Sequence, residues 1–117
     1  MISVVDDDAF VRQATENLLL SLGFAVITFA SAEAFLDSGQ IDDTSCLIAD
    51  VHMPGLTGLD LQRRLVEDGK RLPIIFITAF FSDNVKKRAL EAGAIAFLSK
   101  PFGEDALIEY LHKALHG

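Results

Sequence analysis

The sequence predicts an α/β fold in which a parallel five-stranded sheet carries helices on both faces, and three observations lead to this prediction. Short apolar runs alternate with segments of helical periodicity five times along the chain. Continuous apolar strands are typical of parallel sheets buried on both faces, with helices as the crossovers. The chain has 117 residues, half of them hydrophobic, which suits one domain over residues 1–117 with a single core. With five βα units, we expect the doubly wound strand order 2-1-3-4-5.

The strands are predicted from short apolar runs that are rich in β-branched or aromatic residues. Each run has the length of a strand, and polar or turn-forming residues follow it. In chain order, the five predicted strands are residues 2–5, 24–29, 46–49, 74–77 and 95–98.

The first helix is predicted from residues spaced four apart. Over residues 9–22, four apolar side chains fall on one helical face, which we expect to pack against the sheet: Phe10, Ala14, Leu18 and Leu22.

The other helices are predicted from capping residues, helical spacing and closing glycines. Ser31 caps a short second helix in which Ala34 and Phe35 face inward. The third helix contains Leu59 to Val66. A fourth over residues 85–92 is opened by Ser82. The last covers residues 103–115, with an inner side formed by Ala106, Leu107, Tyr110, Leu111 and Ala114.

Composition argues against several classes of partner. The net charge is −7, from 10 basic and 17 acidic residues, so this domain alone is expected not to bind nucleic acid. The apolar runs are much shorter than a membrane span, and Asp6, Asp7 and Asp8 interrupt any signal-like stretch. Cys46 is the single cysteine and lies in an apolar strand, which indicates an inert core residue and fits a cytoplasmic location.

Polar residues follow four of the five predicted strands. Asp6 and Asp7 follow the first strand, Asp50 the third and Thr78 the fourth, and the fifth leads to Lys100. Ligands of open parallel sheets bind at the carboxyl ends of the strands, near the point where strand order reverses. Each residue alone has an ordinary alternative, such as a helix cap, a turn or a solvated charge. Together they predict a common site.

The predicted site concentrates negative charge. Two carboxylates about 5 Å apart repel by about 3 kcal/mol at an effective dielectric constant of about 20, so the cluster needs cations. Lys100 supplies one. The remaining ligands are hard oxygens, which favour Mg²⁺, an ion that commonly shares its site with phosphate oxygens.

This chemistry suggests a role for each residue. Asp50 is the expected nucleophile towards a phosphoryl group. Asp6, Asp7 and Asp50, with the backbone carbonyl of His52, are the expected Mg²⁺ ligands. Lys100 and the Thr78 hydroxyl are expected to contact phosphoryl oxygens.

The chain resembles the receiver domains of two-component response regulators along essentially all of its length. The matching motifs are Val4-Val5-Asp6-Asp7-Asp8, Asp50-Val51-His52-Met53-Pro54-Gly55, Leu56-Thr57-Gly58-Leu59, Ile77-Thr78-Ala79 and Lys100-Pro101-Phe102. The family's fold is the flavodoxin-like doubly wound sheet.

The resemblance implies properties that the residues alone do not. It implies a sensor histidine kinase as the phosphoryl donor, and a phosphorylation-dependent switch rather than a turnover enzyme. It also implies a cis Lys100–Pro101 peptide bond, and Phe97 as a switch residue that swings inward as Thr78 moves towards the phosphate. From its position alone, Phe97 is predicted to be an ordinary core residue.

A second stretch narrows the resemblance. Residues 23–26, 29–33 and 35–36 are similar to nitrogen-fixation-type regulators, whose receivers precede a helix-turn-helix output domain. We therefore expect transcriptional regulation through a DNA-binding domain outside these 117 residues, and a stand-alone receiver is the alternative.

The face formed by the fourth helix, fifth strand and last helix is expected to change shape on phosphorylation. It carries cations on one element and carboxylates on another, a mixture that permits a symmetric homodimer but also describes a solvated face. These residues are Lys86, Lys87, Arg88, Glu104, Asp105 and Glu109.

Two other functions fit the sequence less well. A metal-dependent phosphohydrolase of the haloacid-dehalogenase type usually has a second aspartate two residues after the nucleophile, where this chain has His52. A flavin or nucleotide binder needs a phosphate-cradling loop, whereas the first turn here is acidic. His52 and Phe80 lie near the expected path of an attacking water, so the lifetime of a phosphorylated state stays open.

Overall fold

The computed structural model describes residues 1–116, in which five strands and five helices alternate. The strands are β1 Ile2–Val5, β2 Val26–Phe29, β3 Cys46–Asp50, β4 Ile74–Thr78 and β5 Ala96–Ser99. The helices are α1 Ala9–Ser21, α2 Ala32–Asp37, α3 Gly58–Glu67, α4 Asp83–Glu91 and α5 Glu104–His116.

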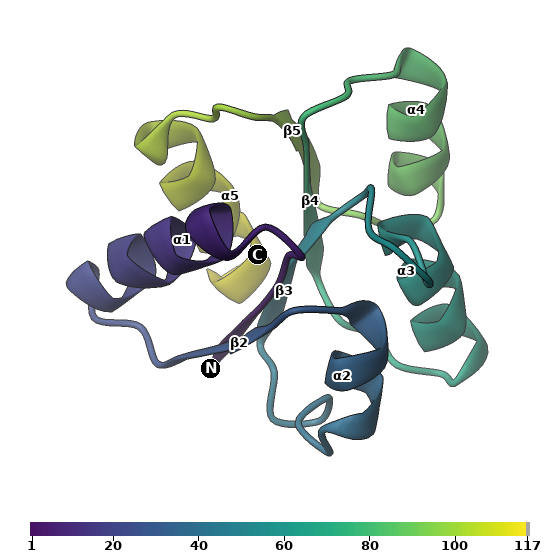
Figure 1. Cartoon of the computed structure of the whole chain (residues 1–117), viewed down its shortest axis with the longest axis horizontal. Coiled ribbons are helices and arrows are strands. Elements are labelled where there is room, and N and C mark those ends of the chain that lie inside the picture. The colour runs from purple at the N-terminus through teal and green to yellow at the C-terminus, as the bar shows by residue number, and fades with distance from the viewer. Residues whose placement is uncertain (117) are drawn as a thin grey trace.

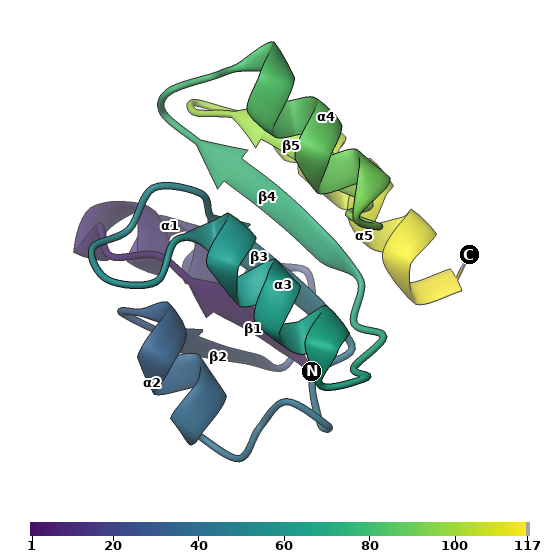
Figure 2. The same ribbon diagram turned by 90° about the vertical axis from the view of Figure 1, so that its right-hand side faces the viewer.

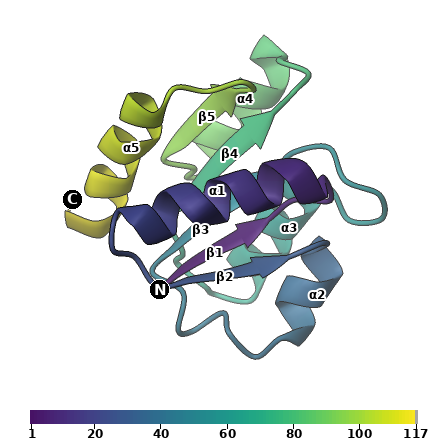
Figure 3. The same cartoon turned by 60° about the vertical axis from the view of Figure 1, so that its left-hand side comes forward.

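The strands form one sheet in the order β2-β1-β3-β4-β5, and all neighbours are parallel. The predicted strand order is therefore confirmed. Val5 at the end of β1 pairs with both Phe29 and Ala49, so β2 ends level with β1 and β3 extends one residue further, to Asp50. Figure 3 shows the arrowheads of β1, β2, β4 and β5 pointing to the same edge of the sheet.

Helices cover both faces of the sheet. Figure 1 shows α1 and α5 on one face and α2, α3 and α4 on the other. Alternate strand residues feed two cores, because successive side chains of a strand point to opposite faces. The core under α1 and α5 contains Val4, Ile48, Ile75 and Leu107, and the core under the other helices is built around Val5, Phe35, Leu61, Phe76 and Phe97.

The predicted inner face of α1 is wrong at three of its four residues, whereas Leu18 is partly buried and packs against the core under α1 and α5. Phe10 is 88% exposed and Leu22 41% exposed, and Ala14 is exposed as well. The helix instead buries Thr15 and Leu19. The hydroxyl of Thr15 donates to the carbonyl of Val11 at 2.8 Å, so a polar residue is satisfied on the buried face. A spacing argument that counts only apolar residues misses this face.

Smaller corrections concern α2 and the ends of elements. Ala32 and Phe35 are buried in α2, whereas Ala34, predicted to face inward, is exposed. Strand β2 begins at Val26 rather than residue 24, because the Phe24 amide still donates to the Leu19 carbonyl of α1 at 3.1 Å. Asp50 and Thr78 are the last residues of β3 and β4 rather than the first residues beyond them.

Side-chain caps start several helices as the sequence indicates. The Asp8 side chain accepts from the amides of Phe10 and Val11, and Ser31 and Ser82 cap α2 and α4. Thr57 and Asp60 form a reciprocal capping box at the start of α3. Of the helices in residues 1–116, none is both long enough and apolar enough to cross a membrane.

Candidate functional site

Three carboxylates meet at the carboxyl edge of the sheet. Asp6 directly follows β1, and Asp50 ends the neighbouring strand β3. One carboxylate oxygen from each of Asp6, Asp7 and Asp50 lies within 4.8 Å of the others. Asp6 and Asp50 are buried, whereas Asp7 is exposed. The cluster is therefore buried on one side and open to solvent on the other.

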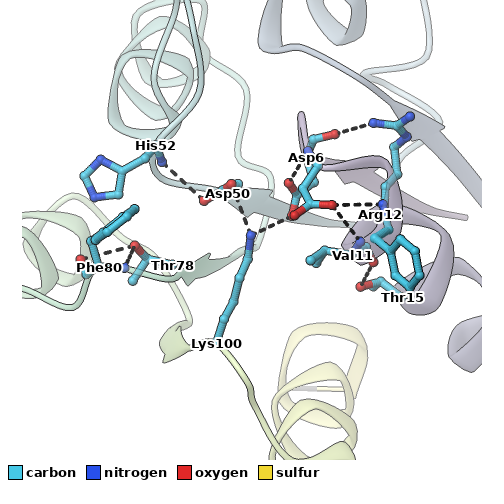
Figure 4. A network of polar contacts seen from close by, with 11 residues as sticks. Asp6, Val11, Arg12, Thr15, Asp50, His52, Thr78, Phe80 and Lys100 are labelled. Carbon is cyan, nitrogen blue, oxygen red and sulfur yellow. Dashed lines mark hydrogen bonds and ion pairs between the residues drawn. The ribbon is translucent and has the colours of Figure 1, made fainter.

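Local hydrogen bonds orient Asp6. Its Oδ1 accepts from the amide of Asp8 at 2.9 Å, which turns the chain from β1 towards α1. Its main-chain carbonyl accepts from the guanidinium of Arg12, on the first turns of α1, at 2.7 Å. Figure 4 shows both contacts beside the carboxylates. The β1–α1 turn is thus held by two hydrogen bonds, one to the side chain of Asp6 and one to its main-chain carbonyl.

Lys100 bridges the two buried carboxylates. Its Nζ lies 3.0 Å from Asp6 Oδ2 and 3.2 Å from Asp50 Oδ2 (Figure 4). The Lys100 amide donates to the Thr78 carbonyl at 2.7 Å, which fixes the loop after β5 to the end of β4. The peptide bond between Lys100 and Pro101 is cis. One ammonium therefore faces two carboxylates, and Asp7 adds a third negative charge.

The protonation equilibria reflect this crowding. Burial raises the pKa of Asp50 and the charge of Asp6 raises it further, and these effects outweigh the opposing influence of Lys100 and of the His52 amide. Burial by itself lowers the pKa of Lys100, but its close contacts and charge interactions with Asp6 and Asp50 prevail and raise it. The site therefore favours the charged form of Lys100 and makes the ionised form of Asp50 less favourable than that of a solvent-exposed aspartate.

The residues fit a hard divalent cation. Asp6 Oδ2 is buried, and within residues 1–116 no group gives it a well-directed hydrogen bond, although Lys100 Nζ is close by. The three acidic groups offer only oxygen ligands, and no histidine belongs to the cluster. A buried oxygen without a hydrogen bond, in an all-oxygen cluster with excess negative charge, suits Mg²⁺ better than a softer metal.

The Thr78 hydroxyl is engaged by its own loop. Its Oγ1 accepts from the Phe80 amide at 3.0 Å and lies 3.2 Å from the Phe80 carbonyl, to which it can donate. Thr78 is fully buried at the end of β4. The structure therefore brings Thr78 to the expected edge of the sheet, with its hydroxyl bonded to the β4–α4 loop.

His52 meets Phe80 across the mouth of the site. The rings are in edge-to-face contact with centroids 5.6 Å apart, and Figure 4 shows them side by side next to Asp50 and Thr78. The His52 amide donates to Asp50 Oδ1 at 3.2 Å. Both side chains are exposed, and Phe80 is 71% accessible. The contact joins the loops after β3 and β4, a link that spacing in the sequence does not reveal.

Phe97 lies inside the core. It is 7% exposed, and its ring packs edge-to-face against Phe81, 5.8 Å between centroids, and lies near Phe76. The ring is buried here while the Thr78 hydroxyl is bonded to the β4–α4 loop. Phe81, which packs on the Phe97 ring, lies in the segment between β4 and α4.

Sequence reasoning missed Arg12 and the choice between two possible caps. Arg12 stands six residues after Asp6, and only folding of the β1–α1 turn brings its side chain to that carbonyl. Asp7 and Asp8 both stand just before Ala9, where a side chain can cap α1. Asp8 does so, which leaves Asp7 available to the acidic cluster.

Comparison with known proteins identifies the family. Residues 2–112 match the response regulator receiver domain family. The chain is 46% identical over 116 residues to the response regulator protein TmoT of Ectopseudomonas mendocina, covering 98% of this chain and 52% of TmoT. It is 39% identical over 114 residues to the transcriptional regulatory protein FixJ of Azorhizobium caulinodans, covering 97% and 54%. The chain spans about half the length of the curated relatives it matches.

Solved structures agree with this match. The response regulator StyR superposes with a TM-score of 0.90 at 44% identity, over 97% of this chain and 58% of that one. The N-terminal part of FixJ superposes with a TM-score of 0.87 at 34% identity, over 97% and 91%. The chain belongs to the response regulator receiver domains of two-component systems, a family of signalling domains.

Proposed function

We propose that Asp50 accepts a phosphoryl group from a phosphohistidine of a sensor histidine kinase. An Asp50 carboxylate oxygen attacks phosphorus, the bond between phosphorus and the donor imidazole nitrogen breaks, and the imidazole leaves with the electron pair. The observation that carries this proposal is the meeting of Asp6, Asp7 and Asp50 within 4.8 Å, with Lys100 in contact with two of them. The three carboxylates repel one another, and this repulsion favours the binding of a further cation beside Lys100.

Mg²⁺ is the proposed cofactor. Asp6, Asp7, Asp50 and the main-chain carbonyl of His52 would hold it, and when bound it neutralises charge on the transferred group. Lys100 would pair with a phosphoryl oxygen. Thr78 would exchange its bonds to Phe80 for a hydrogen bond to another oxygen, which would release the β4–α4 loop.

Release of the β4–α4 loop would carry the signal of phosphorylation to the surface of the domain. Phe80 and Phe81 adjoin Thr78, and Phe81 packs on Phe97 of β5, so movement of Thr78 would reach α4 and β5 through direct contacts. We propose that this face, with α5, forms a homodimer after phosphorylation. Transcriptional control by a DNA-binding domain of the whole protein is the proposed output, in keeping with relatives named as transcriptional regulators.

Intact-mass measurement tests the phosphoryl acceptor. The chain is incubated with acetyl phosphate, with and without Mg²⁺, and compared with Asp50→Ala and with Asp43→Ala, which removes an exposed aspartate of the turn before β3. We expect the wild type and Asp43→Ala to gain one phosphoryl group only with Mg²⁺, and Asp50→Ala to gain none. Equal gain in Asp50→Ala would refute the assignment.

The same incubation separates a switch from a phosphohydrolase. A switch consumes donor only as fast as its own aspartyl phosphate hydrolyses, and it leaves unrelated phosphomonoesters intact. Repeated turnover of a phosphomonoester through Asp50 would instead support the hydrolase alternative.

A further inference from the structure

Two histidines lie one helical turn apart near the end of α5. His112 and His116 are both exposed, and their ring centroids are 5.7 Å apart with an angle of 31° between the ring planes. Residues four apart on a helix share one face, so the pair is a consequence of spacing. The third histidine, His52, lies beside Asp50 at the carboxyl edge of the sheet. Figure 3 shows α5 ending at the opposite end of the molecule from the strand arrowheads.

We propose that His112 and His116 bind one divalent transition-metal ion such as Zn²⁺, at a site separate from the carboxylate cluster. Two nitrogens held at about 2.0–2.1 Å from one tetrahedral ion are about 3.4 Å apart. The two ring centroids are 5.7 Å apart on one helical face, so rotation of the side chains can turn one nitrogen of each ring towards a common ion.

The electrostatic surroundings favour a cation there. The pair occupies the last turns of a 13-residue helix, where the helix dipole and the free carbonyls present negative potential. Asp105 and Glu109 continue the same exposed stripe towards the N-terminus of α5, at helical spacing from His112. The neighbouring cation Lys113 is drawn to the Tyr110 ring, with its Nζ 5.3 Å from the ring centroid. The chain as a whole carries a net charge of −7.

Ligand chemistry separates this site from the acidic one. Imidazole nitrogen suits Zn²⁺, Ni²⁺ and Cu²⁺, whereas an all-carboxylate cluster suits Mg²⁺. Two protein ligands leave the remaining coordination positions to water, so the bound ion exchanges readily, unlike the ion of a four-ligand structural site. Excess Mg²⁺ should occupy the carboxylates without displacing an ion from the imidazoles.

Zinc titration of the whole chain tests the proposal. The protein is prepared without a polyhistidine tag and titrated with ZnCl₂ in excess Mg²⁺, while the ring-proton NMR signals of the histidines are followed. We expect the signals of His112 and His116 to shift together and to saturate at one equivalent, with those of His52 unchanged. His112→Ala and His116→Ala should each weaken binding about tenfold or more, because either change leaves a single imidazole.

His52→Ala is the matched control, because it removes one histidine elsewhere and should retain wild-type zinc affinity. Thermal unfolding gives a second readout: Zn²⁺ should raise the Tm of the wild type and of His52→Ala, but not that of the two α5 variants. Wild-type zinc affinity in both α5 variants, or a response confined to His52, would overturn the proposal. The test is independent of phosphorylation, so it stands apart from the proposed function.

Discussion

Asp50 is the residue at which stability and the proposed chemistry oppose each other. It is 5% exposed, faces the buried carboxylate of Asp6, and shares the single ammonium of Lys100 with it. Burial, followed by the Asp6 charge, raises the pKa of Asp50, so its ionised form is less favourable in the folded chain than in the unfolded one. Placing the ionised carboxylate of Asp50 in this site therefore lowers the free energy of unfolding of the metal-free protein.

Replacing Asp50 with asparagine should stabilise the metal-free protein. At pH 7 with EDTA, we expect Asp50→Asn to raise the free energy of unfolding by about 1 kcal/mol, which is about 4–8 °C in Tm for a domain near this size. Like-charge repulsion is removed, while Lys100 keeps Asp6 as a partner at 3.0 Å. Thermal unfolding followed by circular dichroism measures the change.

The stability gained by Asp50→Asn should depend on pH. A raised folded-state pKa means that the wild-type penalty is fully present above that pKa, fades as the pH falls, and is absent below the ordinary value of 3.8. The advantage of Asp50→Asn should therefore disappear near pH 3. The control Asp43→Asn, at an exposed position, should change little at either pH. A variant less stable than the wild type at pH 7 would contradict this account of the site.

Cys46 should be chemically inert while the chain is folded. Burial raises its pKa to about 12, and the side chain is fully covered in β3, so almost no accessible thiolate forms at neutral pH. We expect negligible reaction with a thiol reagent in buffer and one thiol per chain after denaturation. Rapid labelling under native conditions would show that β3 opens locally, or that the thiol has another role.

Contact between helix α3 and strand β3 ties one element to the site. A Cβ at Gly58, the first residue of α3, would lie 2.5 Å from the Asp50 carbonyl and 2.9 Å from the Cα of Val51. The Gly58 amide also donates to the Val51 carbonyl at 2.8 Å. The start of α3 therefore packs directly against the backbone of the proposed nucleophile. In Figure 2, α3 lies over the centre of the sheet.

Adding one methyl group at this contact should be costly. We expect Gly58→Ala to lower the free energy of unfolding by about 1–3 kcal/mol, because the carbonyl that it meets belongs to a central strand and cannot move freely. Urea denaturation gives the value. Gly103→Ala is the matched control, because a Cβ there meets nothing within 4 Å, and it should have a small effect. Equal stability of the two variants would mean that α3 can shift away without loss.

Another contact between elements connects α3 with α4. Gln62 is buried and its side-chain amide donates to the Ala89 carbonyl at 3.0 Å, close to the end of α4. At the start of α4, Phe81 packs against Phe97. The helix is therefore held at one end by a hydrogen bond and near the other by an aromatic contact with β5.

At the scale of the whole molecule, the α4–β5–α5 face is the proposed dimer surface. Lys87 and Arg88 of α4 and Glu104, Asp105 and Glu109 of α5 are exposed. A symmetric dimer would place the cations of one copy against the carboxylates of the other. Such an interface should weaken with salt, because exposed ion pairs are screened.

Measuring the oligomeric state tests the proposed dimer directly. With Mg²⁺ and beryllofluoride as a phosphoryl mimic, we expect size-exclusion chromatography with light scattering to report twice the chain mass, and without the mimic a single chain. Lys87→Glu should reduce dimerisation, whereas Arg63→Glu, which makes the same change of charge on α3, should not. An unchanged mass in the presence of the mimic would remove the dimer proposal.

Much of this architecture can be read from sequence because local rules decide it. Apolar runs mark the strands, capping residues mark helix starts, and strict βα alternation leaves few topologies, so the predicted strand order is correct. That order places the ends of β1 and β3 side by side. The meeting of Asp6, Asp7 and Asp50, with Lys100 close to two of them, was therefore predictable without coordinates.

Tertiary structure alone decided which face of α1 is buried and which partners the site residues take. Helical spacing shows which residues share a face of the helix but not which face meets the sheet. Thr15 is buried on the sheet side, with its hydroxyl bonded to the Val11 carbonyl, whereas Phe10 is exposed. The bond of Arg12 to Asp6 and the contact of His52 with Phe80 depend on how loops fold back. Such contacts follow from three-dimensional packing, which no local pattern encodes.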